Sequence, residues 1–229
     1  MNIHGLQKMT LLDFPEHVAC TVFLGGCDFR CPFCHNFELV DGSAKPVMEE
    51  EELLAFLSRR QGLLDGVAVT GGEPCLHPDL PELLARIREL GFPVKLDSNG
   101  YHPDMLRTLL DQHLVDYIAM DIKNSPVNYA RTAGLPEVDM GRIRESISLL
   151  MEQAPEYEFR TTVIRELHEE ADFHGIGELI RGAEHYYLQP FTDRDSVPFG
   201  GFHAPEEEQL NAYADIMRSF VETVRVRGV

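Results

Sequence analysis

The chain alternates short β-rich runs with helical patterns from one end of its 229 residues to the other, and this alternation constrains the fold more than any other feature. Such a pattern is typical of parallel strands joined by crossover helices. Six strand–helix units are visible, which predicts an α/β fold built as a partial (β/α)6 TIM-like barrel. The expected strands are 18–24, 67–70, 94–96, 117–120, 157–163 and 186–189.

Several helices have start and stop signals in the sequence. Asp79 is placed as an N-cap, with Glu82 three residues later completing a capping box and Gly91 as the stop. The other helices that follow strands are expected at about 48–60, from near Pro103, and after an N-cap at Asp139.

The C-terminal half contains a long connection and a final helix. The connection, 124–138, is long for a compact domain, and loops of that length are usually functional. The final helix is expected from about 205 and should pack outside the barrel through one apolar stripe. The stripe consists of Leu210, Tyr213, Met217, Phe220 and Val224. No linker or low-complexity stretch divides the chain, so we expect one domain over 1–229.

Three cysteines, Cys27, Cys31 and Cys34, form a C-x3-C-x2-C pattern in a loop at about 25–37, directly after the first predicted strand. Three thiolates at this spacing can bind three corners of a four-iron cluster. The fourth iron then has no protein ligand, and a substrate or cofactor can bind there.

A zinc site is the alternative interpretation, because Cys31, Cys34 and His35 could supply sulfur and nitrogen ligands. A structural zinc site usually adds a second Cys or His pair, and none follows in this sequence. Cys20 and Cys75 each stand alone in or beside an apolar stretch, so we expect both to pack as small buried hydrophobes. If either were a fourth cluster ligand, the open coordination position would be lost.

Polar motifs follow four consecutive predicted strands. The cysteine loop follows the first strand, Gly71-Gly72-Glu73-Pro74 the second, Asp97-Ser98-Asn99-Gly100 the third, and Asp121-Ile122-Lys123 the fourth. In parallel barrels, active sites form at the carboxyl ends of the strands. We therefore expect these motifs to meet in one site.

Composition excludes several classes of function. The formal net charge is −18, from 38 acidic and 20 basic residues, and it would repel nucleic acid phosphates. No apolar run is long enough to span a membrane, and the first residues do not resemble a secretory leader. Five cysteines, three of them within eight residues, suit a reducing compartment. We expect a cytoplasmic protein that works without oxygen and has no nucleic acid or membrane partner.

Taken together, the cysteine loop and Gly71-Gly72-Glu73-Pro74 resemble the radical S-adenosylmethionine (SAM) superfamily over nearly the whole chain. Cys34-His35-Asn36 and the two aspartate motifs are similar to its glycyl radical enzyme activating branch. Gly5-Leu6-Gln7-Lys8 and Leu12-Asp13-Phe14-Pro15 are most similar to activating proteins of anaerobic ribonucleoside-triphosphate reductase, with pyruvate formate-lyase activating enzymes as near relatives.

This resemblance implies an activity, cofactors and partners. The amino and carboxylate groups of SAM would bind the open iron of a 4Fe-4S cluster, and reductive cleavage would give a 5′-deoxyadenosyl radical. That radical would take hydrogen from a glycine of a partner glycyl radical enzyme, with electrons from flavodoxin or another low-potential donor. The alternatives are a pyruvate formate-lyase type of activating enzyme, a radical SAM enzyme acting on a small molecule, and a metal-stabilised module without catalysis.

The resemblance also implies roles for single residues around SAM. Gly71 and Gly72 would let the backbone approach the ligand, and Glu73 would accept a hydrogen bond from its ammonium group. Ser98 and Asn99 would contact the ribose and methionyl parts.

Charged residues would complete the site. Lys123 would pair with the SAM carboxylate. A monovalent cation would be bound by Asp97, Ser98, Asp121 and the carbonyl of Ala119, where it would offset the repulsion between carboxylates.

The last two strands and the cysteine loop should contribute further contacts. Arg160, Thr162 and Gln189 should face the same cavity, and Phe33 and His35 should shield the cluster and pack against adenine. The pyruvate formate-lyase branch has a histidine near the sixth strand, but Leu188-Gln189-Pro190-Phe191 has none. This difference favours another sub-branch.

Overall fold

The computed structural model describes residues 1–228, and within them one eight-stranded sheet has the order β10-β9-β8-β7-β6-β5-β3-β2. Every neighbouring pair is parallel except β2 and β3. The strands are β2 (Gly5–Thr10), β3 (Ala19–Leu24), β5 (Gly66–Gly71), β6 (Val94–Ser98), β7 (Tyr117–Asp121), β8 (Tyr157–Val163), β9 (His185–Pro190) and β10 (Thr223–Val226). All six predicted strands are present, with bounds that differ by two residues or fewer.

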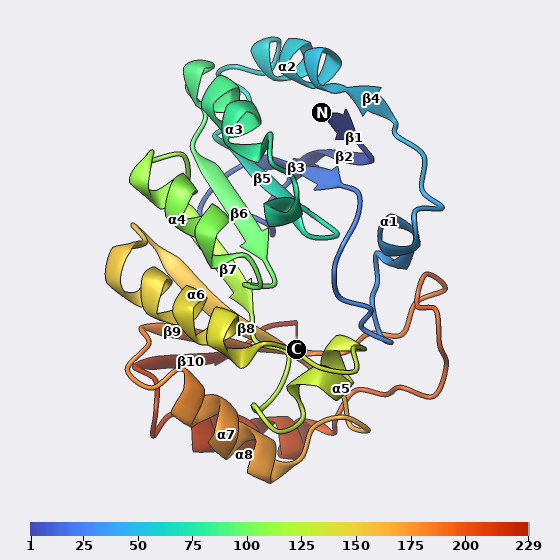
Figure 1. Cartoon of the computed structure of the whole chain (residues 1–229), viewed down its shortest axis with the longest axis vertical. Helices are drawn as coiled ribbons and strands as arrows, with labels where there is room; N and C mark the ends of the chain where they lie inside the picture. Colours follow the sequence, from blue (N-terminus) through green and yellow to red (C-terminus); the bar gives the residue numbers. More distant parts are fainter. Residues whose placement is uncertain (229) are drawn as a thin grey trace.

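Helices follow most of the strands and lie along one side of the sheet, whereas the cysteine loop and α1 lie on the other side (Figure 1). The helices are α1 (Phe37–Asp41), α2 (Glu50–Ser58), α3 (Leu80–Glu89), α4 (Pro103–Asp111), α5 (Tyr129–Ala133), α6 (Met140–Gln153), α7 (Glu170–Leu179) and α8 (Glu207–Met217). This arrangement confirms the predicted partial barrel. None of these helices has the length and apolar character needed to cross a bilayer.

Alternation along the strands gives the sheet one apolar and one polar face. In β8, Phe159 and Val163 are fully buried in the hydrophobic core, whereas Arg160 and Thr162 line a cavity on the opposite face. The core is continuous from the strands to the helices that cover them. The apolar face therefore holds the barrel together and leaves the polar face for a site.

The start of the helix expected at 48–60 differs from the prediction. Met48–Glu49 forms β4, which pairs with β1 (Asn2–Ile3), so α2 begins only at Glu50. Glu49 and Glu52 form a reciprocal capping box at this helix.

The capping box expected at Asp79 does not form, although Asp79 is the N-cap residue and the left-handed Gly91 follows the helix end at Leu90. The Asp79 side chain makes no capping hydrogen bond. The Asp79 backbone, with φ −90° and ψ 5°, lies outside the extended region usual for an N-cap residue, and Pro81 at the second helical position has no N–H to donate.

The connection expected as loop over 124–138 contains the short helix α5. Its end supports the cysteine loop, because the Arg30 N–H donates to the carbonyl of Ala133 at 2.9 Å. A Cβ on Gly134, which has φ of +70°, would lie 1.9 Å from the carbonyl oxygen of Arg30. Only glycine allows this close approach.

The C-terminal segment was predicted as one helix but divides into α8 and β10. The helix ends at Met217, and Val224 lies in β10, paired in parallel with Tyr186 of β9. Phe220 lies in the turn between them. The β-branched residues in Thr223–Val226 favour a strand, and the open edge of β9 provides its partner.

An ion pair between the buried Glu158 and the partly exposed Arg227, which directly follows β10, connects this added strand to the centre of the sheet. Glu158 has no exposed surface, and both of its oxygens accept hydrogen bonds from the Arg227 guanidinium, at 2.9 Å each. The Tyr117 hydroxyl donates to the same carboxylate at 2.7 Å. Burial alone would raise the pKa of Glu158, but Arg227 and Tyr117 outweigh it and lower the pKa.

Replacing Arg227 with Met should destabilise the fold by about 2–3 kcal/mol, because Glu158 stays buried but loses the cation that bonds to both of its oxygens. The loss is smaller than for a fully buried pair because Arg227 is partly exposed. Urea unfolding measures the change. Arg225→Met, at an exposed position of the same strand, should change stability by less than about 0.5 kcal/mol. Equal stability of the two variants would contradict the role of the ion pair, whereas adding Glu158→Gln to R227M should recover part of the loss.

Candidate functional site

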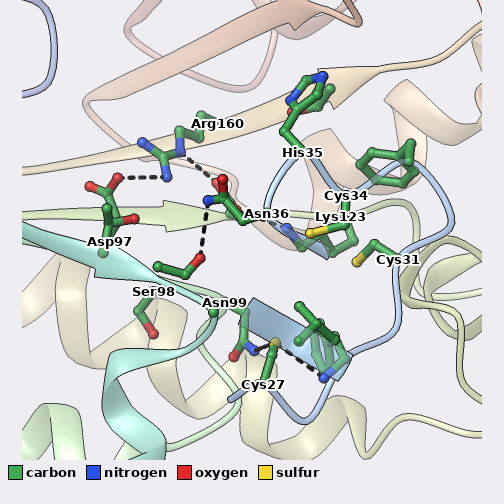
Figure 2. Close-up of a pocket in the computed structure, with 18 of the residues that line it drawn as sticks. Cys27, Cys31, Cys34, His35, Asn36, Asp97, Ser98, Asn99, Lys123 and Arg160 are labelled. Atoms are coloured by element: carbon green, nitrogen blue, oxygen red, sulfur yellow. Dashed lines mark hydrogen bonds and ion pairs between the residues drawn. The ribbon is translucent and has the colours of Figure 1, made fainter. Parts of the chain in front are cut away.

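A cavity of about 230 Å³ lies where the strands β5 to β9 end, beside the cysteine loop (Figure 2). Every site residue predicted from the sequence lines it except Glu73 and Ala119, and Ala119 is fully buried in the core. The predicted residues in the wall are Cys27, Cys31, Phe33, Cys34, His35, Gly71, Gly72, Asp97, Ser98, Asn99, Asp121, Lys123, Arg160, Thr162 and Gln189. Motifs from six separate parts of the sequence thus meet in one place.

The three cysteines of the loop are free and face this cavity (Figure 2). Burial raises the pKa of Cys27 to about 12 and that of Cys31 to about 11, and it also raises the pKa of Cys34. Lys123 opposes the shift at all three thiols, so a cation faces the sulfurs. Within residues 1–228, no three Cys, His, Asp or Glu side chains are grouped to hold a single metal ion. Three soft sulfur donors around a shared cavity fit a cluster with a protein-free corner.

Two glycines bring the end of β5 against the start of the cysteine loop. The Gly72 N–H donates to the carbonyl of Leu24 at 2.9 Å, and the Glu73 N–H donates to that of Gly26 at 2.8 Å. A Cβ on Gly72 would lie 1.9 Å from the Gly26 carbonyl oxygen, and one on Gly71 would lie 2.2 Å from that of Leu24. These positions need glycine because backbone meets backbone.

Glu73 differs from the prediction, because its side chain is fully buried and lies outside the cavity wall. One oxygen accepts hydrogen bonds from the Cys75 N–H and the Ser98 hydroxyl, both at 2.9 Å. The other accepts from the Asn99 N–H at 2.6 Å. Burial raises the pKa of Glu73. The carboxylate therefore fixes the end of β6 and is not available to a ligand ammonium in this structure.

A second polar connection joins the cysteine loop to the start of α4. Asp28 accepts hydrogen bonds from the Asn99 amide and from His102 Nε2, both at 2.9 Å. The same Asn99 amide approaches the sulfur of Cys27 at 3.9 Å. The hydrogen bond to Asp28 raises the pKa of His102. Burial would raise the pKa of Asp28, but its hydrogen bonds with His102 and Asn99 outweigh burial and lower it. Each group of the pair therefore favours the charged form of the other.

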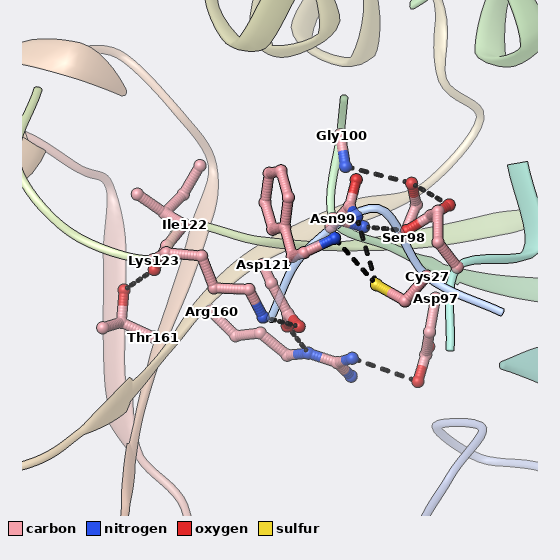
Figure 3. Close-up of polar contacts among 12 residues, drawn as sticks. Cys27, Asp97, Ser98, Asn99, Gly100, Asp121, Ile122, Lys123, Arg160 and Thr161 are labelled. Carbon is pink, nitrogen blue, oxygen red and sulfur yellow. Dashed lines mark hydrogen bonds and ion pairs between the residues drawn. The ribbon is translucent and has the colours of Figure 1, made fainter. Parts of the chain in front are cut away.

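Opposite the sulfurs, charged side chains from three strands form one group (Figure 3). The Arg160 guanidinium lies between the two carboxylates: Nη2 bonds to Asp97 at 3.1 Å and Nε bonds to Asp121. Lys123 donates to Asp121 at 2.8 Å, and Lys95 donates to Asp97. Burial would raise the pKa of both carboxyls, but these cations lower it, so both stay ionised.

The segment after β9 contacts the cysteine loop. The His35 ring stacks on Phe191 with centroids 5.5 Å apart, and its Nε2 lies 2.6 Å from the carbonyl oxygen of Thr192. Phe33 is buried in the cavity wall. Both rings therefore lie in the cavity wall near the cysteines, and their shielding role stays a prediction.

Four cavity residues were not predicted as site residues: Phe29, Asn36, Val40 and Thr70. Asn36 anchors the loop by donating to the Gly71 carbonyl at 3.2 Å. Asn36 could have been predicted from its position in the Cys34-His35-Asn36 motif. Thr70 could have been predicted from strand alternation, which places it on the inner face of the sheet. Nothing in the sequence distinguishes the two apolar residues, Phe29 and Val40, from residues of the hydrophobic core.

Comparison with known proteins identifies the class to which this site belongs. The model of the radical SAM superfamily matches residues 21–172, which is well over half of the chain. The chain therefore belongs to the radical SAM superfamily.

Two relatives make the comparison more specific. The chain is 28% identical over 235 residues to a Methanocaldococcus jannaschii protein provisionally named as a glycyl-radical enzyme activating enzyme, covering 99% of this chain and 96% of that protein. It is 32% identical over 127 residues to the pyruvate formate-lyase-activating enzyme of Clostridium pasteurianum, covering 53% of this chain and 52% of that enzyme.

The fold is similar to solved structures. Streptococcus suis SuiB bound to its precursor peptide SuiA matches with a TM-score of 0.69 at 13% identity, over 95% of this chain and 50% of that one. At this identity the match shows the fold alone. The chain spans nearly the whole M. jannaschii relative and about half of the other two proteins.

The link between His102 and Asp28 predicts a pH-dependent stability. Because the pKa of His102 is raised in the folded state, its contribution is complete below about pH 6.5 and is lost as pH rises through the folded pKa. The lowered pKa of Asp28 keeps its contribution present down to about pH 4. His102→Gln should therefore cost about 1 kcal/mol at pH 5.5 and clearly less at pH 9.

Urea unfolding of the cluster-free protein at the two pH values measures this difference. The control is His174→Gln, since His174 is exposed and forms no ion pair within residues 1–228. A cost of H102Q that is the same at both pH values would contradict the charged pair.

Proposed function

We propose that this chain is an activating enzyme for a glycyl radical enzyme, and that its partner is anaerobic ribonucleoside-triphosphate reductase. The observation that carries the proposal is the cavity itself. Three free cysteines form one wall, and Lys123 and Arg160 lie across from them (Figure 2). Sulfur donors on one side and cations on the other fit a cluster together with a ligand that carries a carboxylate.

Cys27, Cys31 and Cys34 would hold a 4Fe-4S cluster, and the single domain 1–229 would hold SAM beside it. With both groups bound, reductive cleavage of SAM supplies a 5′-deoxyadenosyl radical, which takes hydrogen from a glycine α-carbon of the partner. The protein contributes positioning and exclusion of water. Phe33 and His35 close the side of the cavity near the cysteines.

The residues of the opposite wall would orient SAM. Lys123 is fixed by its ion pair with Asp121, and from there it can bind the ligand carboxylate. The backbone at Gly71 and Gly72 is open to the cavity and can contact the methionyl part. Asn99, Thr162 and Gln189 provide neutral hydrogen-bonding groups for the ribose and adenine.

The proposed branch rests on the relatives and on two sequence features. A relative named for glycyl radical enzyme activation aligns over nearly the full length of both chains. The opening motifs, 5–8 and 12–15, resemble activating proteins of the reductase, and Gln189 occupies the sixth strand where the pyruvate formate-lyase branch has a histidine nearby. The electron donor would be flavodoxin or another low-potential carrier in the cytoplasm.

Electron paramagnetic resonance tests the partner directly. The anaerobically reconstituted protein, with SAM and a low-potential reductant, should produce a glycyl radical doublet when mixed with the large subunit of anaerobic ribonucleoside-triphosphate reductase. Pyruvate formate-lyase in its place should give at most about a tenth of that signal, because the docking surfaces differ. A strong doublet with pyruvate formate-lyase alone would assign the other branch, and SAM cleavage without a doublet from either would favour a small-molecule substrate.

Cysteine variants provide the matched control for this experiment. Cys31→Ala should abolish iron binding and the radical signal together, because the cluster loses one of its three ligands. Cys20→Ala removes a buried cysteine outside the cavity and should leave both intact. Retention of both properties by C31A would contradict the assignment of the ligands.

A further inference from the structure

Lys95 is a buried cation that has no role in the proposed function. Its side chain is 3% exposed, and it lies in β6 between the core residues Val94 and Leu96. Because side chains alternate along a strand, Lys95 points to the same face as Asp97, and it donates a hydrogen bond to that carboxylate. A lysine is rarely buried to this extent without a compensating charge.

With Lys95 included, every oxygen of the two carboxylates has a cationic partner. Figure 3 shows the contacts that Arg160 and Lys123 make. Asp97 accepts from Lys95 through Oδ1 and from Arg160 through Oδ2. Asp121 accepts from Arg160 through Oδ1 and from Lys123 through Oδ2. Arg160 thus occupies the space between the carboxylates, where a bound cation would have to lie.

Ser98, expected as another ligand of that cation, is also engaged elsewhere. Its hydroxyl donates to Glu73 at 2.9 Å and accepts from the Gly100 N–H at 3.0 Å. The residues present therefore do not fit the monovalent cation that the family resemblance implies.

The charges of this group lead to the same conclusion. Two carboxylates, Asp97 and Asp121, face three cations, Lys95, Lys123 and Arg160, so the group carries one net positive charge. One carboxylate from a ligand would make it neutral. A monovalent ion would restore a net positive charge in a poorly solvated place, which is unfavourable.

We propose that Lys95 and Arg160 are the permanent counter-ions of Asp97 and Asp121, so that this site takes no monovalent cation and selects a ligand group with one negative charge. Lys95 acts as a positioning residue, since it holds Asp97 in place for Arg160. This inference rests on the proposed function in one respect, because it identifies the negatively charged ligand group as the carboxylate of SAM.

A change of salt tests the proposal on the wild-type holoenzyme. The affinity for SAM, by calorimetry, and the melting temperature without SAM are measured in potassium, sodium and tetramethylammonium chloride at equal ionic strength. The affinity should agree within about twofold among the three salts, and the melting temperature should not change. A loss of affinity of about tenfold or more in tetramethylammonium, or a melting temperature raised only by potassium or sodium, would overturn the proposal.

The Lys95→Met variant, measured in the same three salts, tests the role of Lys95 directly. Its control is Lys45→Met, at an exposed lysine outside the cavity. Without Lys95, the group together with the ligand carboxylate carries one negative charge, and a monovalent cation becomes favourable. K95M should therefore bind SAM about tenfold more tightly in potassium or sodium than in tetramethylammonium, whereas K45M should behave as wild type.

A K95M protein that is as insensitive to the cation as wild type would overturn the role of Lys95. If K95M does not fold, Lys95→Gln, which keeps a hydrogen-bond donor, replaces it in the same comparison. Failure of SAM to bind in any salt would reject the proposed function, while the melting temperatures without SAM still decide whether the group binds a cation.

Discussion

The buried carboxylate of Glu73 holds the site together. It accepts hydrogen bonds from the backbone of Cys75 and Asn99 and from the hydroxyl of Ser98, so it joins the ends of β5 and β6. Its own N–H bonds to the Gly26 carbonyl and thereby fixes the start of the cysteine loop. A buried carboxyl group that accepts three hydrogen bonds gives these connections a strong geometric preference.

The parallel strands then determine which chemical groups can meet. Their carboxyl ends lie along one edge, and alternation turns Asp97, Asp121 and Arg160 to the same face of the sheet. The cysteine loop crosses this edge, held by glycine contacts on one side and by α5 on the other. Sulfur donors and fixed charges therefore face each other across one cavity, the arrangement that a bound cluster and a zwitterionic ligand require.

The sequence predicted the strands because they depend on local periodicity. Most of the cavity wall was predicted from the motifs that follow the strands and from the family resemblance. It did not reveal the role of Glu73, since the partners that bury this carboxylate come from β6, more than twenty residues further along the chain. Strand β10 was missed because Phe220 and Val224 also fit the helical spacing of α8, and only the free edge of β9 decides between the two. No role was predicted for Lys95, because the charge pairing of a buried lysine becomes visible only in three dimensions.

The most direct test is electron–nuclear double resonance of the reduced cluster with SAM labelled with 15N in its amino group and 17O in its carboxylate. If Cys27, Cys31 and Cys34 are the only protein ligands, the spectra should show coupling of the cluster to both labels. A reduced four-iron cluster that shows neither coupling while SAM is bound would mean that SAM does not bind the fourth iron, and it would contradict the account.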